Sequence, residues 1–254
     1  MPVDHLVILL LAALAAGWVD AVVGGGGLIQ LPALLLLGPS APVAALATNK
    51  LGSIAGTSSA AVAYLRRARP DLRVAGPAAL LAVACAAGGA LCAAALSADV
   101  LKPVVLAVLL AVAVIVVLNP RLGREARDVP RTRRRIAAAV AVPGVVIAFY
   151  DGLVGPGTGT FLVLAFTALL GSDFVRASAN AKIINTGTNL GALLVFGAQG
   201  HILWALGLAM GACNVVGAQV GARMAISRGT GFVRAVLLCV VTALVLKLGA
   251  EQFA

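Results

Sequence analysis

Charged residues are scarce in this chain, and the side chains that hydrolytic enzymes use in catalysis are scarcer still. Only 11% of the 254 residues are charged, whereas a soluble domain has about 25%. The two histidines, His5 and His201, lie at an end of the chain and at an end of an apolar segment, and no Ser–His–Asp set accompanies them. The composition therefore argues against a soluble protein and against an enzyme.

Signals for a metal or a nucleotide are also absent from the sequence. The cysteines show no CxxC spacing and have no histidine nearby, and they lie in apolar runs where small sulfur side chains usually serve as packing residues. The segment GPGTGT at 155–160 lacks the lysine of a phosphate-binding P-loop. No cofactor is expected. The cysteines are Cys85, Cys92, Cys213 and Cys239.

Apolar sequence, in contrast, is abundant. Hydrophobic residues make up 61% of the chain, and the mean hydropathy is +1.07. Uncharged runs of about 18 residues or more recur along the whole length, and such runs are typical of membrane-spanning helices. The start, MPVDHLVILL, has no Lys or Arg and so lacks the positive region of a signal peptide. We expect an all-α polytopic membrane protein that retains its first apolar segment.

The net charge of +10 is concentrated in connectors between apolar runs. Four arginines lie within 66–73 and seven within 121–135. Clustered basic residues between apolar spans usually mark cytoplasmic loops, so we expect membrane lipid, and no nucleic acid, around this protein. With 66–73 and 119–135 in the cytoplasm, the basic segment 223–234 is cytoplasmic only if 136–170 enters the membrane and returns.

Two halves of the chain resemble each other at their rarest residues. A shift of 131 positions places Asp20 on Asp151 and Gly24 on Gly155, with no gap. The same shift matches further polar and glycine residues, and it misses the lysine pair by a single residue. The predicted organisation is a first repeat (1–118), an Arg-rich cytoplasmic linker (119–135) and a second repeat (136–254). The further matches are Gly26 with Gly157, Asn49 with Asn180, Gly56 with Gly187 and Thr57 with Thr188.

Each half is predicted to contain a broken hairpin followed by three crossings, which gives about eight hydrophobic segments. The hairpin arms are expected to be about 15 and 10–13 residues long, each shorter than the membrane core of about 30 Å. Three crossings are an odd number, so the repeats should be inverted, as in many secondary transporters. The hairpins are predicted at 5–37 and 136–170, and the crossings at 43–65, 73–96, 101–118, 174–198, 202–225 and 231–249.

Four charges are predicted to lie inside the membrane, where they are costly and usually functional. They are Asp20, Lys50, Asp151 and Lys182. The lysines either bind an anion or form structural ion pairs. The aspartates either neutralise the lysines and cap the broken helices, or carry a coupling proton. The accompanying amides and hydroxyls are either ligand contacts or polar links between helices. The amides among the candidates are Asn49, Asn180, Asn185 and Asn189.

Two glycine loops supply the other half of the predicted site. Each loop precedes a short helix, whose N-terminus carries free N–H groups and about half a positive charge and therefore favours anions. Pro156 removes one N–H from the second loop, so the two loops cannot bind identically. Gly217 and Gly221, in contrast, are interpreted as a helix-packing motif. The loop residues predicted to contact substrate are Gly24, Gly25, Gly26, Gly27, Gly155, Gly157, Thr158 and Gly159.

These motifs resemble the sulfite exporter TauE/SafE family of membrane permeases. In the first half the resemblance rests on GWVDAVVGGGGLIQLPALLLLG and ATNKLGSIAGT, and in the second on YDGLVGPGTGTFLVLAF and SANAKIINTGTNLGALLVFGAQGHILW. It covers about residues 15–250. The resemblance implies a carrier of sulfite, sulfonates, thiosulfate or other small organic acids.

The sequence therefore predicts a secondary transporter in the bacterial plasma membrane. It would export small sulfur-containing anions by alternating access around a site at the membrane midplane, with protons as a possible coupling ion. The alternatives are an anion channel or facilitator, an uptake permease for another small organic acid, and a non-transporting scaffold. The residues do not specify the anion, the direction or the oligomeric state.

Overall fold

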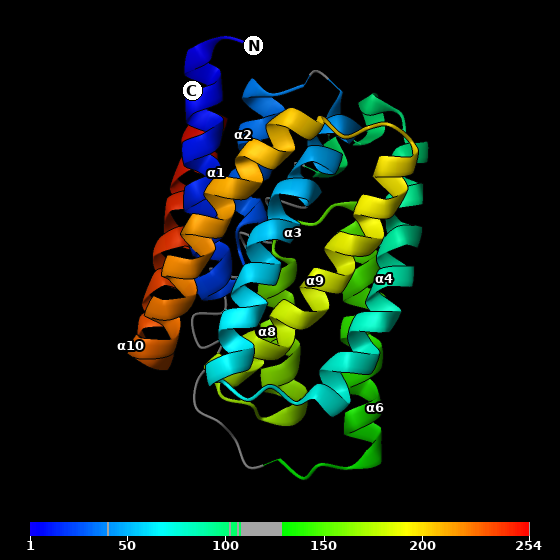
Figure 1. The fold of residues 1–254 in the computed structure, drawn as a ribbon, viewed down its shortest axis with the longest axis vertical. Helices are drawn as coiled ribbons and strands as arrows, with labels where there is room; N and C mark the ends of the chain where they lie inside the picture. The colour runs from blue at the N-terminus through cyan, green and yellow to red at the C-terminus, as the bar shows by residue number, and fades with distance from the viewer. Residues whose placement is uncertain (40, 102, 106, 108–128, 254) are drawn as a thin grey trace.

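The computed structural model describes residues 1–39, 41–101, 103–105, 107 and 129–253, and of 230, 234, 237–238 and 240–253 only the backbone is described. Every element in these ranges is a helix. The expectation of an all-helical protein is confirmed for them, whereas most of the predicted span 101–118 and of the linker 119–135 lies outside them. The helices, drawn in Figure 1, are α1 (Val3–Val23), α2 (Gly27–Leu37), α3 (Pro42–Arg67), α4 (Leu72–Ala95), α6 (Arg133–Ala141), η1 (Val142–Ile147), α7 (Ala148–Leu153), α8 (Thr158–Leu170), α9 (Phe174–Ala198) and α10 (Trp204–Phe253). A kink at Gly229, with φ of 70°, divides α10 into two helical stretches.

Several of these helices are long and apolar enough to cross a membrane. Four stretches meet both criteria: Val3–Val23, Leu72–Ala95, Arg133–Leu153 and Trp204–Gly229. The helices α3 and α9 are also long, with 26 and 25 residues, but they carry the polar residues of the predicted site. Apolar side chains such as Leu80 and Leu208 are exposed at 77% and 60%, which suits contact with lipid. The protein is a multi-pass membrane protein.

Both predicted breaks occur at the glycine motifs. Helix α1 ends at Gly24 with φ of 79°, and Gly155 and Gly157 separate α7 from α8 with φ of 95° and 81°. A side chain at such a φ is strained, so glycine is needed at these turns. The short helices α2 and α8, with 11 and 13 residues, begin directly after the breaks.

The first arm of each broken pair is longer than expected. The stretches Val3–Val23 and Arg133–Leu153 each have 21 residues rather than about 15, which corresponds to about 32 Å. The prediction that these arms are shorter than the membrane core of about 30 Å is therefore wrong for the first arm of each pair. Polar residues at their starts, such as Arg133, extend the first turns beyond the apolar run. In the first arm of the second pair, Pro143 does not end the helix, because the π-helical segment η1 accommodates it.

The two broken pairs enter the molecule from opposite ends (Figure 1). Helix α1 runs from the end that holds the N-terminus to the middle, and α2 returns to that end. The stretch α6–η1–α7 rises from the other end to the middle, and α8 returns there. Helices α3 and α9 pass beside both tips. The tips touch, because Thr160 donates a backbone hydrogen bond of 3.2 Å to Gly24 O and a side-chain bond of 3.0 Å to Val23 O.

Close approach of backbones explains several other glycines. A Cβ on Gly24 would lie 2.3 Å from the carbonyl carbon of Gly159. Likewise, a Cβ on Gly217 would lie 2.0 Å from Leu14 O, and one on Gly221 would lie 2.5 Å from Trp18 O. Small residues that let backbones approach are typical of helix contacts in membranes. The prediction that Gly217 and Gly221 form a helix-packing motif is confirmed, and the structure shows that they pack α10 against α1.

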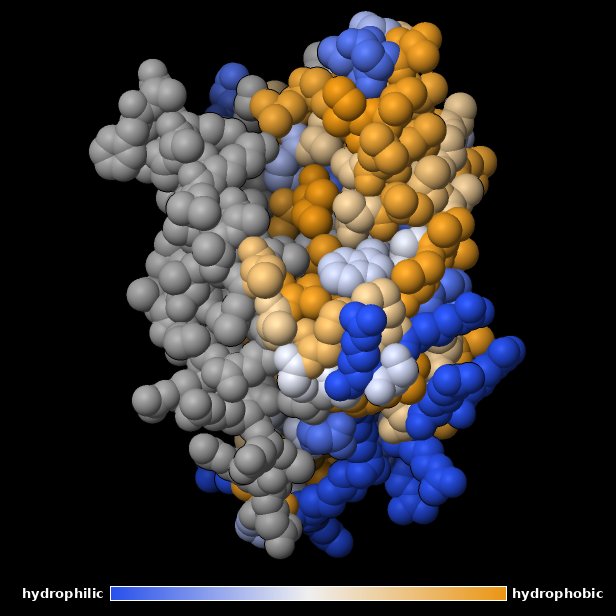
Figure 2. All heavy atoms as spheres, turned by 90° about the vertical axis from the view of Figure 1, so that its left-hand side faces the viewer, coloured by the Kyte–Doolittle hydropathy of each residue, from blue (hydrophilic) through white to orange (hydrophobic). Residues whose placement is uncertain are grey.

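Arginines gather at one end of the molecule, which we call the basic end. It is formed by the end of α3 (Arg66, Arg67), the start of α4 (Arg73) and the start of α6 (Arg133, Arg134), all exposed. Figure 2 shows hydrophilic residues at this end of the face it draws and largely hydrophobic residues above them. The described arginines thus agree with the expected cytoplasmic loops, while Arg121, Arg124 and Arg127 lie outside the described residues.

Candidate functional site

The four intramembrane charges form two ion pairs that cross between the halves of the chain. Lys50 on α3 lies 2.7 Å from Asp151 on α7, measured from Nζ to Oδ2. Lys182 on α9 lies 2.7 Å from Asp20 on α1, again from Nζ to Oδ2. Each pair therefore joins a lysine of one half to the aspartate of the other half.

Burial makes the pairing necessary. The side chains of Lys50 and Asp151 are 3% exposed, and those of Lys182 and Asp20 are 2% and 13% exposed. An isolated charge in an apolar interior is so costly that it is rarely left unpaired. The two pairs cancel, so the centre of the molecule is electrically neutral.

The Lys182–Asp20 pair is tied down by several hydrogen bonds. Lys182 donates to Asp20 Oδ2 at 2.7 Å and also to the main-chain oxygen of the same residue. Thr57 on α3 donates to Asp20 Oδ2 at 3.2 Å. This cluster links α1, α3 and α9 and leaves the Lys182 ammonium with two protein acceptors.

The Lys50–Asp151 pair is held more simply. In the described part of the chain, the Lys50 ammonium has Asp151 Oδ2 as its only polar contact. An ammonium carries three donors, so two remain for another acceptor. The Asp151 carboxylate also accepts a hydrogen bond of 2.6 Å from Thr158, at Oδ1. The same hydroxyl lies 2.6 Å from Gly155 O.

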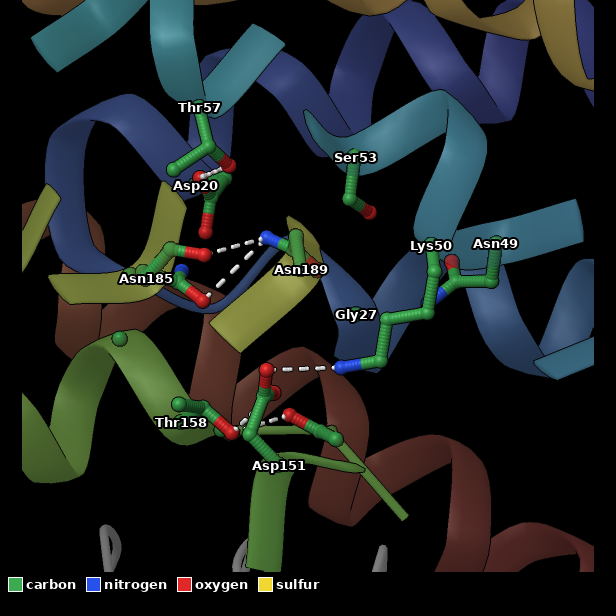
Figure 3. A pocket seen from close by; sticks show the side chains of 14 residues that line it. Asp20, Gly27, Asn49, Lys50, Ser53, Thr57, Asp151, Thr158, Asn185 and Asn189 are labelled. Atoms are coloured by element: carbon green, nitrogen blue, oxygen red, sulfur yellow. Dashed lines mark hydrogen bonds and ion pairs between the residues drawn. The ribbon is translucent and has the colours of Figure 1, made fainter. Parts of the chain in front are cut away.

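A small cavity opens between the two hairpin tips and the middles of α3 and α9 (Figure 3). Its volume is about 20 Å³, enough for roughly one water molecule. Charged, amide and hydroxyl side chains and loop glycines surround it. They are Asp20, Gly24, Gly27, Asn49, Lys50, Ser53, Thr57, Asp151, Gly155, Gly157, Thr158, Gly159, Asn185 and Asn189.

Most of the predicted site residues line this cavity, but four do not: Gly25, Gly26, Asn180 and Lys182. Asn180 instead accepts a hydrogen bond of 2.8 Å from the backbone N of Asp71, just before α4. Lys182 contacts Asp20 rather than the cavity. Its one-residue offset from the position that matches Lys50 turns it about 100° around the helix, which explains the different direction.

The amides of α9 are already linked to each other. Asn189 donates to Asn185 O at 2.8 Å, and Thr188 donates to the same oxygen at 2.9 Å (Figure 3 shows the Asn189 bonds). Asn49 on α3 differs, because its buried Oδ1 has no hydrogen-bond partner among the described residues. The cavity therefore has an unused acceptor beside Lys50.

Behind the site lies a chain of buried, hydrogen-bonded amide side chains that was not predicted from the sequence. Asn214 on α10 donates to Gln30 on α2 at 2.8 Å, and Gln30 donates to the backbone oxygen of Asn49 at 3.5 Å. A Cβ on Gly56 would lie 1.8 Å from Asn214 Oδ1, so that glycine makes room for the amide. Gln30 and Asn214 could have been noticed only as isolated amides within apolar segments. The comparison of the two halves did not point to them, because neither Gln30 nor Asn214 matches a polar residue in the other half.

Both short helices point their N-termini toward the cavity. Gly27, the first residue of α2, and Gly159, in the first turn of α8, line it. The N–H groups of Gly27 and Gly159 have no backbone acceptor among the described residues, whereas those of neighbours such as Leu28 and Thr160 already donate to loop carbonyls. The aligned peptides also make this end of each helix positive. Together with Lys50 these helix ends form a site suited to a small anion. No group of three or more metal-ligating His, Cys, Asp or Glu side chains occurs among the described residues.

The fold and the site define a class of protein, a multi-pass helical membrane protein with a polar centre. Comparison with known proteins agrees with this class. The model of the sulfite exporter TauE/SafE family matches residues 9–248. The chain belongs to this family, whose relatives below are named as membrane transporters, not enzymes.

Three relatives carry the words "probable membrane transporter protein" in their names. The chain is 39% identical to ORF9 of a Sinorhizobium species over 97% of its own length and 93% of the relative. It is 35% identical to YfcA of Escherichia coli K12, with coverage of 92% and 85%, and 35% identical to a protein of Haemophilus influenzae, with coverage of 91% and 89%. No solved structure matches the chain.

Proposed function

We propose that this protein is a secondary transporter that exports small sulfur-containing anions, such as sulfite or organosulfonates, across a bacterial plasma membrane. The observation that carries the proposal is the cavity where Lys50 and two helix N-termini face each other. Backbone N–H groups and an ammonium are favourable partners for an oxyanion. The sulfur class and the outward direction rest on the description of the family model.

The architecture we propose is a pair of inverted repeats, each with a re-entrant hairpin and three crossings. The opposite entry of the two broken pairs supports it, as does the crossing of the ion pairs between the halves. Two equivalent halves of opposite orientation can exchange their conformations, which would open the site first to one side and then to the other. Irregular backbone is tolerated at membrane depth when it lines such a site.

In the proposed site Lys50 holds the charge of the anion. The loop glycines donate backbone N–H groups, and the α9 amides, Asn185 and Asn189, complete the hydrogen bonds. The remaining predicted residues, which do not line the cavity, support it from behind: Asn180 fixes the start of α4, and Lys182 fixes Asp20. In alternating access, this site would be open to the solution on one side of the membrane at a time.

A carrier is favoured over an anion channel because the cavity offers only about 20 Å³ of space to a water-sized molecule. That volume admits about one water molecule, so an ion the size of sulfite requires the surrounding helices to move apart. A channel would instead hold a continuous polar path. Flux that saturates and shows counterflow in liposomes would support the carrier, whereas electrodiffusive flux would support the channel.

The proposed function is tested by thermal stabilisation of the purified protein with sulfite, sulfoacetate, thiosulfate and acetate. We expect sulfur anions to raise the Tm of the wild type. Lys50→Gln should abolish this shift, but it also leaves Asp151 buried without its partner. The double variant Lys50→Gln/Asp151→Asn removes both charges and should insert normally while still failing to respond. Arg134→Gln, which removes an exposed cation, is the control. A normal response of the double variant would contradict the proposed site.

A further inference from the structure

We infer that Asp151 carries a proton together with the transported anion, with Thr158 as the residue that accommodates both protonation states, while Asp20 stays ionised. This inference rests on the proposed function, because it names the coupling ion of the same site. Export then follows the outward concentration gradient of the anion, which has to exceed the inward gradient of the proton that moves with it. It rests on the different surroundings of two aspartates that the sequence repeat makes equivalent.

Charge balance in the cavity requires a compensating cation or proton. The charged groups facing Asp151 in the described residues are Lys50 from α3, and Asp20 from α1 with its partner Lys182 from α9. The faces of α4 and α8 that pack against α7 contribute no charged group there, and Tyr150 on α7 directs its hydroxyl to Pro156 O. These charges cancel. An entering anion would add an uncompensated buried charge, which is costly in a low-dielectric interior.

A proton on Asp151 removes this cost. The entering anion takes the two free donors of the Lys50 ammonium and competes with the carboxylate for the third. A proton from water on the entry side forms an O–H bond at Asp151 Oδ1, which neutralises the carboxylate and releases Lys50 to the anion. On the other side the anion leaves, the O–H bond breaks, and the proton returns to water. No bond in the anion changes.

Thr158 is placed to accept this change. Its hydroxyl carries one hydrogen and lies 2.6 Å from two acceptors, Asp151 Oδ1 and Gly155 O. With Asp151 ionised, the hydrogen points to the carboxylate. With Asp151 protonated, the acid donates to Thr158 Oγ1, and the hydroxyl turns to Gly155 O. Both states are thus fully hydrogen-bonded, and only a hydrogen has to rotate.

Asp20 lacks this device. Lys182 and Thr57 both donate to its Oδ2, and Lys182 also bonds its main-chain oxygen. In the described residues Thr57 has no second acceptor comparable to Gly155 O. Protonation of Asp20 would leave Lys182, only 2% exposed, without its counter-ion. The pair therefore serves as a fixed link between α1 and α9.

The test uses the full-length protein in liposomes that contain a pH dye, with the membrane potential clamped. The probes are methanesulfonate and isethionate, because each organosulfonate carries a single negative charge and takes up no proton near neutral pH. Wild-type influx of either anion should acidify the lumen by about one proton per anion, as expected for an intramembrane carboxylate that relays protons. Anion influx without acidification would overturn the inference and leave the proposed function standing. Absence of influx of both probes would overturn both.

Variants assign the proton to its residue. Asp151→Asn should show no acidification in whatever anion flux remains. Thr158→Val should slow influx driven by a pH gradient about tenfold, and Thr158→Ser, which restores the hydroxyl, should recover it. Thr167→Val is the matched control on the same helix, since that hydroxyl bonds only the α8 backbone, at Val163 O. Thr57→Val should keep one proton per anion. Loss of acidification in Thr57→Val but not in Thr158→Val would overturn the assignment.

Discussion

At the scale of single residues, the aspartate–lysine pairs are the feature with the largest energetic consequence. Replacing one partner of a buried pair leaves the other charge uncompensated, which costs about 3–5 kcal/mol. Lys182 and its partner Asp20 are buried to 2% and 13% exposure, so they fall in this class. A surface ion pair, by contrast, contributes at most about 1 kcal/mol.

We therefore predict that Asp20→Asn lowers the free energy of unfolding by about 3–5 kcal/mol. The measurement is thermal or denaturant unfolding of the purified protein in detergent. Asp20→Asn/Lys182→Gln should recover much of the loss, because it removes both charges at once. Asp4→Asn is the control, since Asp4 is exposed in the first turn of α1 and forms no ion pair among the described residues, so its loss should cost at most about 1 kcal/mol. Equal losses in Asp20→Asn and Asp4→Asn would contradict a structural role for the buried pair.

Single-residue chemistry was only partly predictable. The sequence marked all four charges, because acids and bases are rare in apolar segments. It did not indicate that each lysine pairs with the aspartate of the other half, since that depends on how the halves pack. Nor did it indicate that Lys182 turns away from the cavity, although the one-residue offset from Lys50 was visible.

At the scale of elements, the broken helices depend on glycines for two different reasons. Gly24 has φ of 79°, and a Cβ there would also lie 2.3 Å from the backbone of Gly159. Gly200 has a similar φ of 73°, but nothing lies within 4 Å of a Cβ at that position. A substitution at Gly200 therefore introduces backbone strain alone, whereas one at Gly24 also disturbs the contact between the hairpin tips.

We predict that Gly200→Ala costs about 1–2 kcal/mol of stability, from backbone strain alone. Gly24→Ala should cost more, because the tips must move apart, and it should also abolish anion-induced stabilisation, because Gly24 lines the cavity. Unfolding of both variants and the thermal response to sulfite provide the measurements. If Gly24→Ala lost no more stability than Gly200→Ala, the contact between the tips would not support the fold.

Element positions were the most predictable level of structure. The expected crossings 43–65, 73–96 and 174–198 correspond closely to α3, α4 and α9. The predicted helix length was wrong where tertiary packing overrides the local preference of a residue. Pro143 would normally end a helix, but the π-helical turn continues the chain to the break at Gly155, and the first arm became longer than expected.

At the scale of the whole molecule, the direction of each helix follows from the position of the arginines. Helix α3 runs toward the basic end, and α9 runs away from it (Figure 1). The positive-inside rule places the basic end in the cytoplasm. We therefore propose that the connection between α9 and α10, and the N-terminus, face the opposite solution.

This topology predicts the labelling of single cysteines introduced at exposed positions, in a background where the native cysteines are replaced. Gln199→Cys, between α9 and α10, should react with a membrane-impermeant maleimide added to intact cells. Arg67→Cys, at the basic end of α3, should react only after the membrane is permeabilised. The two positions lie at opposite ends of crossing helices, so reaction of both from the same side would contradict the inverted arrangement. Reaction of Arg67→Cys alone in intact cells would instead preserve the fold and reverse its orientation, which would place the arginines outside, against the electrostatic preference that we used to orient it.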